Sequence, residues 1–472
     1  MSDNMDIRDK MRSQLAGKAV FEQACTYAYD YMDRVSDRPV VPSEKALRDL
    51  DIFDEPLPQQ PGDAAEILSM LHEYGSPATM AQTAGRYFGF VNGSSTPAAL
   101  AAKWLSDVWD QNTALYVMSP IAAQLEAVCE KWIVSLLGLP EETAAGFVSG
   151  TSIATACGLA AGRNELLKRQ GWDAASKGLF GAPPLRVVVG EQAHATVFKA
   201  LALLGLGRDR VEKVPVDSQG CMRADRLPEL DNNTLLVLQA GNVNSGAFDP
   251  LDELCERARK ADSWVHIDGA FGLLAAASGN KRHLTKGMEK ADSWSVDAHK
   301  TLNAPYDCGI ILCRNRDALI GSFQTSGSYI LYSGKRDGML YAPEMSRRAR
   351  GVELWATLKF FGRKGVEELI DGLCDRAVQF AELLAAKGFR ILNDVVFNQV
   401  LVACASPEET KAALEKLQKS GECWCGGAVW KGEPAIRISV CSWATTPQDV
   451  ERSAAAFAAA RSASRSEIER RQ

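Results

Sequence analysis

The sequence has no apolar run close to the roughly 20 residues that a membrane-spanning helix needs. Its first residues, MSDNMDIRDKMRSQ, contain no apolar core of a secretory signal. The formal net charge of -6 argues against a general nucleic-acid binder, which must neutralise phosphates with basic residues. The 12 cysteines have no framework spacing, and the close pair Cys423 and Cys425 is a poor zinc half-site. We therefore expect a cytoplasmic protein with no metal ion, no nucleic-acid partner and no membrane association.

Short apolar runs alternate with helical stretches between residues 146 and 314. Several of these runs are apolar on both faces, as in a parallel sheet that helices cover on each side. The predicted strands are 186–190, 235–238, 264–268, 294–296 and 310–312. This pattern predicts an α/β domain with a mostly parallel sheet.

The pattern changes toward both ends of the chain. Near the start, helical stretches are joined by the proline-rich connectors DRPVVPSEK and DEPLPQQPGD, which suggests a segment draped over another surface. After Gly351 a long helical stretch precedes short strands such as FNQVLVAC and AIRISVCS, which indicates a smaller α+β domain. We predict three parts, residues 1–85, 86–350 and 351–472.

Polar side chains gather at the ends of four predicted strands. They are His194, Asn244, Asp268, Asp297, His299 and Lys300. Ligands of open parallel sheets bind at the carboxyl ends of the strands. One buried aspartate or histidine would only cap a loop, but four such strand ends at one edge indicate a functional site.

The stretch Ser149-Gly150-Thr151-Ser152 precedes a helical segment of small residues, IATACGLAAGRN. Free backbone N–H groups at a helix start, with two hydroxyls beside them, form an anion site. The spacing matches neither a Walker nor a Rossmann glycine motif. An ordinary helix cap is the alternative, and the small residues could equally reflect close packing on the sheet.

Lys300 lies between two apolar runs, which suggests that it is removed from water. Desolvation favours the neutral amine of a lysine, and a neutral amine attacks carbonyl carbons. An aspartate on a neighbouring strand would suit the pyridinium nitrogen of pyridoxal phosphate, with Thr151 at the phosphate and His194 over the ring. Lys300 is therefore a candidate for Schiff-base formation.

Several motifs, in order along nearly the whole chain, resemble one enzyme family. They are YFGFVNGSSTPAAL (87–100), MSPIAAQLE (118–126), SGTS (149–152), HATVFKA (194–200), HIDGAFG (266–272), SVDAHKTLNAPYDCG (295–309), MSRRARGVELWATLKFFGRKG (345–365) and IRISVCSW. This set resembles the group II pyridoxal-phosphate decarboxylases, which include the aromatic-amino-acid and glutamate decarboxylases. The resemblance implies the aspartate-aminotransferase fold (fold type I), with a mostly parallel seven-stranded sheet in a large domain and a small α+β C-terminal domain.

The resemblance also implies roles for the residues at the strand ends. Lys300 would carry pyridoxal 5'-phosphate as an internal aldimine. Asp268 would pair with the pyridine nitrogen and His194 would stack on the ring, so these three residues are the implied catalytic set.

The remaining cofactor contacts follow from the same motifs. Thr151, Ser152 and His299 would hold the phosphate. Ala270 would pack beneath the ring, and Asn244 would approach its hydroxyl side.

Members of this family are dimers with shared active sites, so a homodimer is expected. The stretch around Phe90-Val91-Asn92 would reach the partner's site, and the N-terminal helices would clasp the other subunit. Phe90 and Asn92 are therefore candidate substrate contacts. Arg347 or Arg350 is a candidate clamp for the substrate carboxylate, although either could be a structural ion-pair partner.

Two positions depart from the family pattern. Asp337 or Gly338 stands where the mobile loop normally carries a proton-donating tyrosine, and Tyr332 and Tyr341 are near but not aligned. Asp297 replaces the usual asparagine of the lysine motif. Without the tyrosine the reaction could end in oxidation to an aldehyde, or His194 could donate the proton.

The expected reaction is decarboxylation of an L-amino acid to the corresponding amine and carbon dioxide. The alternatives are an aldehyde synthase, another reaction at the α-carbon, a metal-dependent hydrolase, or an inactive homologue that serves as a scaffold. Tyr87, Phe88 and Phe90 favour an aromatic or other apolar substrate over glutamate, unless these rings are ordinary packing.

Overall fold

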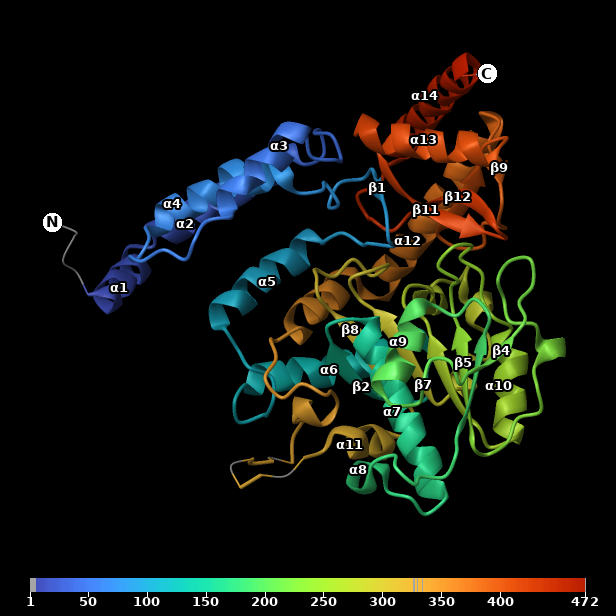
Figure 1. The fold of residues 1–472 in the computed structure, drawn as a ribbon. Helices are drawn as coiled ribbons and strands as arrows, with labels where there is room; N and C mark the ends of the chain where they lie inside the picture. The colour runs from blue at the N-terminus through green and yellow to red at the C-terminus, as the bar shows by residue number, and fades with distance from the viewer. Residues whose placement is uncertain (1–5, 326, 329, 333, 472) are drawn as a thin grey trace.

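The computed structural model describes residues 6–325, 327–328, 330–332 and 334–471. A seven-stranded sheet and a five-stranded sheet form its two main parts (Figure 1). The strands are β1 (Tyr87–Phe88), β2 (Ala144–Val148), β3 (Arg186–Gly190), β4 (Glu212–Val214), β5 (Thr234–Gln239), β6 (Trp264–Asp268), β7 (Ser293–Asp297), β8 (Gly309–Cys313), β9 (Arg390–Ile391), β10 (Gln399–Ala403), β11 (Trp424–Trp430) and β12 (Glu433–Ser439).

Helices cover both sheets and form the N-terminal region. The α-helices are α1 (Ile7–Gly17), α2 (Ala19–Arg34), α3 (Glu44–Asp49), α4 (Ala64–Met70), α5 (Pro97–Trp109), α6 (Pro120–Leu137), α7 (Thr151–Arg169), α8 (Ala174–Lys177), α9 (Ala195–Leu203), α10 (Leu251–Lys260), α11 (Arg316–Phe323), α12 (Gly351–Ala386), α13 (Pro407–Ser420) and α14 (Pro447–Arg471). No helix in the described ranges is long and apolar enough to cross a membrane.

The seven-stranded sheet has the order β2-β8-β7-β6-β5-β3-β4. Every neighbouring pair is parallel except the two that include β8, which runs antiparallel to β2 and β7. The prediction of a mostly parallel seven-stranded sheet is therefore confirmed, and all five strands predicted from apolar runs are present. The apolar runs did not predict β2, which is rich in small residues, or the short polar edge strand β4.

Two hydrophobic clusters sandwich this sheet, as its two apolar faces require. On one face α7, α9 and α11 pack against β-strand residues such as Val189, Val237 and Ile311. On the other face α6, α10 and the first half of α12 pack against residues such as Leu236 and Ile267. The sheet is thus buried on both sides, and only the ends of its strands can open toward a ligand.

The small residues of α7 are explained by close packing on the sheet. A Cβ atom at Gly158 would lie 2.5 Å from His266 Nδ1, and one at Gly162 would lie 2.7 Å from Trp264 Cδ1. Such distances are shorter than any van der Waals contact allows. The helix therefore approaches β6 closely because two of its residues have no side chain.

The C-terminal part is built on the sheet β1-β11-β12-β10-β9. Phe380 of α12, Val400 of β10, Ile436 of β12 and Phe457 of α14 meet in its core. The long helix α12 crosses from one part to the other and breaks at Gly362, whose φ of 56° is a left-handed conformation that favours glycine. Strand β11 contains two consecutive glycines and was not predicted from the sequence.

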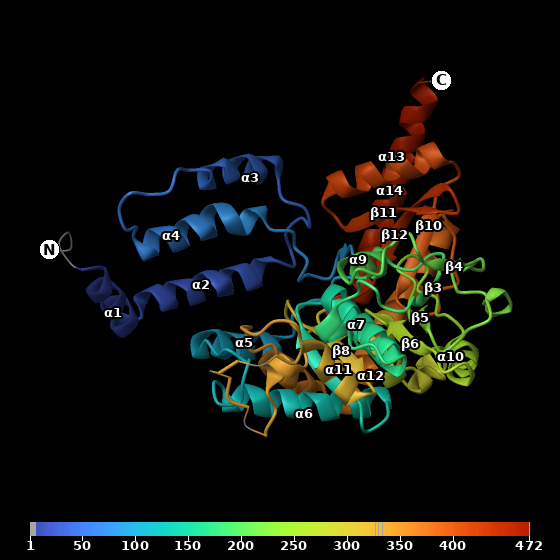
Figure 2. The same cartoon turned by 60° about the horizontal axis from the view of Figure 1, so that its bottom comes forward.

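The N-terminal helices α1 to α4 form an arm that projects away from both sheets (Figures 1 and 2). Helices α1, α2 and α4 bury none of their residues in the single chain. Apolar side chains instead remain exposed on them, including Met11, Leu15, Phe21 and Ile67. Between α2 and α3, residues 36–40 reach the C-terminal part, where Val40 N–H donates to the Gly421 carbonyl at 2.7 Å.

Candidate active site

Lys300 lies in a turn that joins two antiparallel strands of the central sheet. Strand β7 ends at Asp297 and β8 begins at Gly309, so residues 297–308 form what we call the lysine turn. The Lys300 side chain is 19% exposed, and its Nζ lies 3.2 Å from Asp297 Oδ2. A largely buried amine is therefore present at the carboxyl end of β7.

Asn303 fixes the shape of the lysine turn. Its Oδ1 accepts the backbone N–H groups of Ser94 at 3.0 Å and Trp443 at 2.9 Å. Its Nδ2 donates to the carbonyl of Lys300 at 3.2 Å and to that of Cys441 at 3.0 Å. Asn303 has a φ of 57°, a left-handed conformation that asparagine tolerates better than most residues. One side chain thus ties the turn to two distant segments.

Asp268 stands at the carboxyl end of β6, the strand next to β7. The residue is 5% exposed, and its Oδ1 accepts the Ala270 N–H at 3.3 Å. Burial raises the pKa of this carboxyl, while His194 and Lys300 oppose the rise. Within the described residues, no lysine, arginine or histidine nitrogen lies within 4.0 Å of this carboxylate. A buried carboxylate that has no cationic partner of its own is suited to a cationic ligand.

His194 caps the N-terminus of α9 and lies at the same edge of the sheet. Its Nδ1 is 2.8 Å from the Thr196 hydroxyl and accepts the Thr196 N–H at 3.4 Å. Burial lowers the pKa of His194, and the nearby Asp268 opposes this effect. Both residues line one small cavity, so the structure brings the predicted ring-stacking and ring-pairing side chains together.

The predicted phosphate turn meets the lysine turn at the first residue of α7. Thr151 N–H donates to Asp297 Oδ1 at 2.7 Å, and the Thr151 hydroxyl bonds to Asp297 Oδ2. His299 Nε2 lies 3.6 Å from Asp297 Oδ2, and its Nδ1 accepts the Cys308 N–H at 3.1 Å. Burial lowers the pKa of His299. The adjacent Ser152 side chain is exposed.

Ala270 lies between the two acidic strand ends. Its N–H donates to Asp268, and its carbonyl accepts the Asp297 N–H at 2.9 Å. Asn244 belongs to a tight loop after β5, in which its N–H donates to Asn242 Oδ1 at 2.9 Å. All the residues expected to contact the cofactor therefore lie on segments that follow the carboxyl ends of neighbouring strands or begin α7.

The segment that includes Phe90 and Asn92 contacts the lysine turn. Gly93 N–H donates to the His299 carbonyl at 3.2 Å, and the Tyr306 hydroxyl donates to Asn92 Oδ1 at 3.0 Å. These residues therefore pack on the lysine turn of their own chain, and their approach to a partner's site stays a prediction. Gly93 permits this close approach, because a Cβ there would lie 2.2 Å from the Lys300 carbonyl oxygen.

Aromatic rings flank this segment. Trp424 of β11 stacks on Tyr87 and on Phe90, with 5.3 Å between ring centroids in each pair. Phe90 has a φ of 53° and keeps 61% of its surface exposed. The left-handed backbone costs free energy, so the fold must hold this ring in its outward position.

Arg347 and Arg350 are held in ion pairs. Arg347 Nη2 lies 2.9 Å from Glu126 Oε1, and its side chain is 2% exposed. Arg350 Nη2 lies 3.3 Å from Asp307 Oδ2. Both guanidinium groups are already paired with carboxylates of their own chain, which corresponds to the structural alternative that the sequence left open.

Arg437 was not among the sequence-predicted site residues. It lies on β12, its Nη1 is 3.4 Å from the Val243 carbonyl, and it carries no ion pair among the described residues. Burial lowers its pKa, and its charge in turn lowers the pKa of His194. The only available signal was an arginine inside the apolar strand IRIS.

The residues near the missing loop tyrosine have structural contacts. Asp337 Oδ1 accepts the Tyr116 N–H at 2.8 Å. The Tyr341 hydroxyl accepts a hydrogen bond from Arg316 at 2.8 Å, and the Tyr332 hydroxyl donates to the Thr325 carbonyl at 2.7 Å. Each group that stands near the expected proton donor is thus bonded to its own surroundings.

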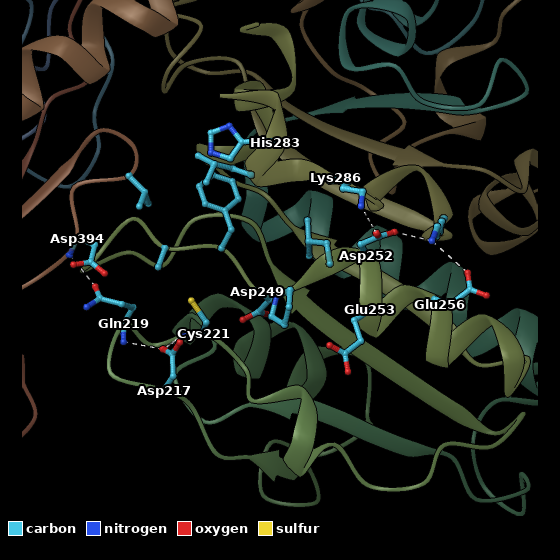
Figure 3. A pocket seen from close by; sticks show the side chains of 17 residues that line it. Asp217, Gln219, Cys221, Asp249, Asp252, Glu253, Glu256, His283, Lys286 and Asp394 are labelled. Carbon is cyan, nitrogen blue, oxygen red and sulfur yellow. Dashed lines mark hydrogen bonds and ion pairs between the residues drawn. The ribbon is translucent and has the colours of Figure 1, made fainter. Parts of the chain in front are cut away.

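A cavity of about 620 Å³ shares Asp249 with the small cavity that His194 and Asp268 line. Figure 3 shows the acidic side chains that surround it, with Lys286 directed at Asp252. No residue of the lysine turn lines this cavity. Among the described residues, no group of three or more histidine, cysteine, aspartate or glutamate side chains could hold a metal ion.

A lysine amine, a buried carboxylate on the neighbouring strand and an imidazole at the same edge define a pyridoxal-phosphate enzyme of fold type I. The model of the pyridoxal-dependent decarboxylase conserved domain matches residues 47–403. The chain belongs to this family, and it is a decarboxylase that depends on pyridoxal phosphate.

Relatives with assigned activities agree with this family. The chain is 26% identical over 440 residues to the aromatic-L-amino-acid decarboxylase of Bacillus atrophaeus, covering 89% of this chain and 88% of the relative. It is 24% identical over 441 residues to tyrosine decarboxylase 2 of Narcissus pseudonarcissus, covering 87% of each.

Solved structures share the fold. The structure of Oryza sativa TDC with PLP and tryptamine has a TM-score of 0.87 at 22% identity, covering 98% of this chain and 99% of that one. Rhodiola rosea 4-hydroxyphenylacetaldehyde synthase has a TM-score of 0.81 at 23% identity, covering 97% and 99%.

Proposed function

We propose that this enzyme removes the α-carboxyl group of an aromatic L-amino acid as carbon dioxide and releases the amine, with Lys300 as the residue that holds the cofactor. The observation that carries this proposal is the position of Lys300. Its amine is largely buried at the end of β7, and Asp268 ends the next strand.

The residues present fit pyridoxal phosphate. Asp268 is a buried carboxylate with no ion-pair partner among the described residues, and a protonated pyridine nitrogen would balance its charge. The N-terminus of α7 supplies backbone N–H groups and hydroxyls for a phosphate, with the His299 imidazole beside it. When bound, the ring of this cofactor takes up the electron pair of the bond that breaks at the α-carbon.

The other side chains position the substrate and its protons. His194 would lie over the ring, because it lines the same small cavity as Asp268. Arg437 is the cation that we assign to the substrate carboxylate, since its side chain is half-buried and carries no ion pair among the described residues. Holding that carboxylate perpendicular to the ring would select the bond to the carboxyl carbon for cleavage.

Aromatic side chains favour an aromatic substrate. Phe90 and Trp424 present stacked rings beside the lysine turn, and Asn92 adds a polar group that already bonds to Tyr306. Stacked rings bind aromatic groups by burial of apolar surface and by offset stacking. The names of the relatives, which include tyrosine and aromatic-L-amino-acid decarboxylases, also support this substrate class.

An aldehyde synthase is the second candidate function. The observation that favours it is the absence of a tyrosine at the expected loop position, together with the structural contacts of Asp337, Tyr332 and Tyr341. The fold neighbour from Rhodiola rosea carries an aldehyde synthase name. Oxygen consumption with release of ammonia and peroxide would identify this outcome, whereas decarboxylation alone consumes no oxygen.

We also propose a cytoplasmic homodimer. The apolar residues on α1, α2 and α4 need a cover that their own chain does not provide. A second copy would cover them if each arm clasped the other subunit. Sedimentation of the full chain would give twice the mass of 51.2 kDa, and a chain that sediments as a monomer would contradict this part of the proposal.

The first test is chemical labelling of the lysine. The protein is incubated with pyridoxal phosphate, reduced with borohydride and digested, and the phosphopyridoxyl mass is mapped. We expect the label on Lys300 and none on a folded Lys300→Ala variant, whose carbon dioxide release should fall by about 10³-fold or more. A chain that stays unlabelled, or a label confined to surface lysines, would contradict the assignment of Lys300.

A further inference from the structure

Asp297 occupies the position at which α7 would meet a phosphate. Its Oδ1 accepts the Thr151 N–H at 2.7 Å, and its Oδ2 bonds to the Thr151 hydroxyl. The residue is 3% exposed. The helix N-terminus that the cofactor phosphate needs is therefore already in contact with an acidic side chain.

The second oxygen of Asp297 faces the cofactor-binding groups. Oδ2 lies 3.2 Å from Lys300 Nζ and 3.6 Å from His299 Nε2. Lys300 is thus the cation that balances Asp297 in the free chain. Condensation of this amine with an aldehyde forms a C=N bond and releases water, which leaves Nζ at most one hydrogen in place of the three of the ammonium.

A phosphate dianion and a carboxylate would then lie close together in a buried site. Two like charges a few ångströms apart repel strongly where water is excluded. The other titratable groups whose charges act on Asp297 or His299 are His194, Asp268, Tyr306 and Asp307. Tyr306, Asp268 and Asp307 carry no positive charge, and His194 lies beside Asp268 rather than in contact with Asp297.

His299 is poorly placed to accept the extra proton. Its Nδ1 accepts the Cys308 N–H, so the hydrogen of the neutral ring belongs on Nε2, which faces Asp297. Protonation of Nδ1 would break that hydrogen bond inside the protein. Asp297 itself is the group that can relieve the repulsion by becoming neutral.

We propose that Asp297 is a phosphate-positioning residue that acts as a carboxylic acid, with a proton on Oδ2 that it donates to a phosphate oxygen of the cofactor. Phosphate binding would then take up one proton. This proposal rests on the proposed function of Lys300, and it assigns to Asp297 the donor role that an asparagine amide would fill without a proton.

The test compares two aldehydes that differ only in the phosphate, pyridoxal phosphate and pyridoxal. Both condense with the same lysine. The dissociation constant of pyridoxal divided by that of pyridoxal phosphate therefore measures what the phosphate adds to binding, and we call this ratio the phosphate advantage. The constants are measured by quenching of tryptophan fluorescence from pH 7.5 to pH 9, above the second phosphate pKa of about 6. Because the complex holds the extra proton, the phosphate advantage should fall as pH rises, by up to about tenfold per pH unit.

The Asp297→Asn variant should behave as the permanently neutral acid. Its phosphate advantage should not depend on pH and should exceed that of the wild type at pH 9. Calorimetry in two buffers with different ionisation heats should show about one more proton taken up with pyridoxal phosphate than with pyridoxal, in the wild type alone. Asp292→Asn, a control at the opposite end of β7, should keep the wild-type dependence.

Two results would overturn the proposal. One is a wild-type phosphate advantage that stays constant with pH, which needs no variant to be measured. The other is an Asp297→Asn variant that binds pyridoxal like the wild type but shows a smaller phosphate advantage at pH 9. If neither aldehyde attaches to Lys300, the proposed function of Lys300 fails instead.

Discussion

Polar side chains occupy two levels of the same strands in the central sheet. At the interior level, His266 Nδ1 lies 2.9 Å from Ser293 Oγ, and Ser295 Oγ lies 3.0 Å from Thr155 Oγ1. At the carboxyl edge, two residues further along each strand, Asp268 and Asp297 replace these uncharged groups. Both levels are buried, so burial does not distinguish structural from functional polar residues.

The difference lies in the partners. Each interior group has an uncharged partner on a neighbouring element, and such satisfied pairs hold the fold together. At the edge, Asp268 has one weak backbone donor, and Asp297 shares its oxygens among Thr151, His299 and Lys300. The carboxylates at this edge are not fully balanced by fixed groups of the chain. This imbalance marks the edge as the place where a ligand binds.

The largest expected effect is at the edge. Asp268→Asn should lower the rate of carbon dioxide release by about 10²- to 10³-fold, because it removes a pre-organised charge beside the reacting group. The free energy of unfolding should not fall, since burial already disfavours the charged carboxyl. The measurement is the turnover rate at saturating cofactor, together with denaturant unfolding.

The matched control is a half-buried aspartate at the other end of these strands. Asp292 accepts the Val265 N–H at 2.7 Å, and burial raises its pKa to about 6. Asp292→Asn should leave the turnover rate within about twofold, because Asp292 precedes β7 and lies at the opposite end of the strand from Lys300. Equal losses in the two variants would remove the distinction between the edge and the rest of the strand.

A smaller effect is expected at the interior level. Gly158→Ala should lower the free energy of unfolding by about 1–3 kcal/mol, the usual cost of overpacking a core. The added Cβ would lie 2.5 Å from His266 Nδ1, whose ring is held by Ser293. Urea unfolding followed by circular dichroism gives this difference.

Gly372 offers a control in another long helix. Nothing lies within 4 Å of a Cβ built at this position of α12. Gly372→Ala should therefore leave stability unchanged or raise it by about 0.4–1 kcal/mol. A loss as large as that of Gly158→Ala would mean that helix context, and not contact with His266, sets the cost.

The last effect depends on pH and concerns the buried side chain of His266. Burial lowers the pKa of His266 from 6.5 to about 3, so the folded chain holds it neutral. Its contribution to stability is present above pH 6.5 and is lost as pH falls toward 3, by at most about 1.4 kcal/mol per pH unit. Unfolding free energies of the wild type and His266→Gln, measured from pH 7 to pH 4, should therefore converge.

The exposed residue His283 supplies the comparison for this measurement. His283→Gln should keep the wild-type dependence on pH, since the substitution is at an exposed position outside the core. If His266→Gln has the same slope as the wild type, protonation of the interior level does not limit acid stability.

The fold was largely predictable because its central strands carry their own signal. Runs such as 235–238 and 264–268 are apolar on both faces, which only a doubly covered sheet accommodates. The strands β4 and β11 were missed for opposite reasons. The first has three residues and a polar edge, and the second contains glycines that are typical of turns.

The candidate site was predictable for residues that follow adjacent strands, because such residues lie close together in space. Asp268 and Lys300 follow adjacent parallel strands, so their proximity follows from the rule for strand ends. Arg347 could not be assigned in this way, because its partner Glu126 is 221 residues distant in sequence. Arg437 was missed because β12 comes beside the site only through packing of the C-terminal part.

Asn303 has a consequence for how the molecule unfolds. Its amide joins the turn that carries Lys300 to the amides and carbonyls of Ser94, Cys441 and Trp443. Separation of the C-terminal part would strip a buried side chain of its hydrogen bonds and release the lysine segment at the same moment. Melting of the two regions should therefore be a single cooperative event, with no folded intermediate that keeps an intact lysine turn.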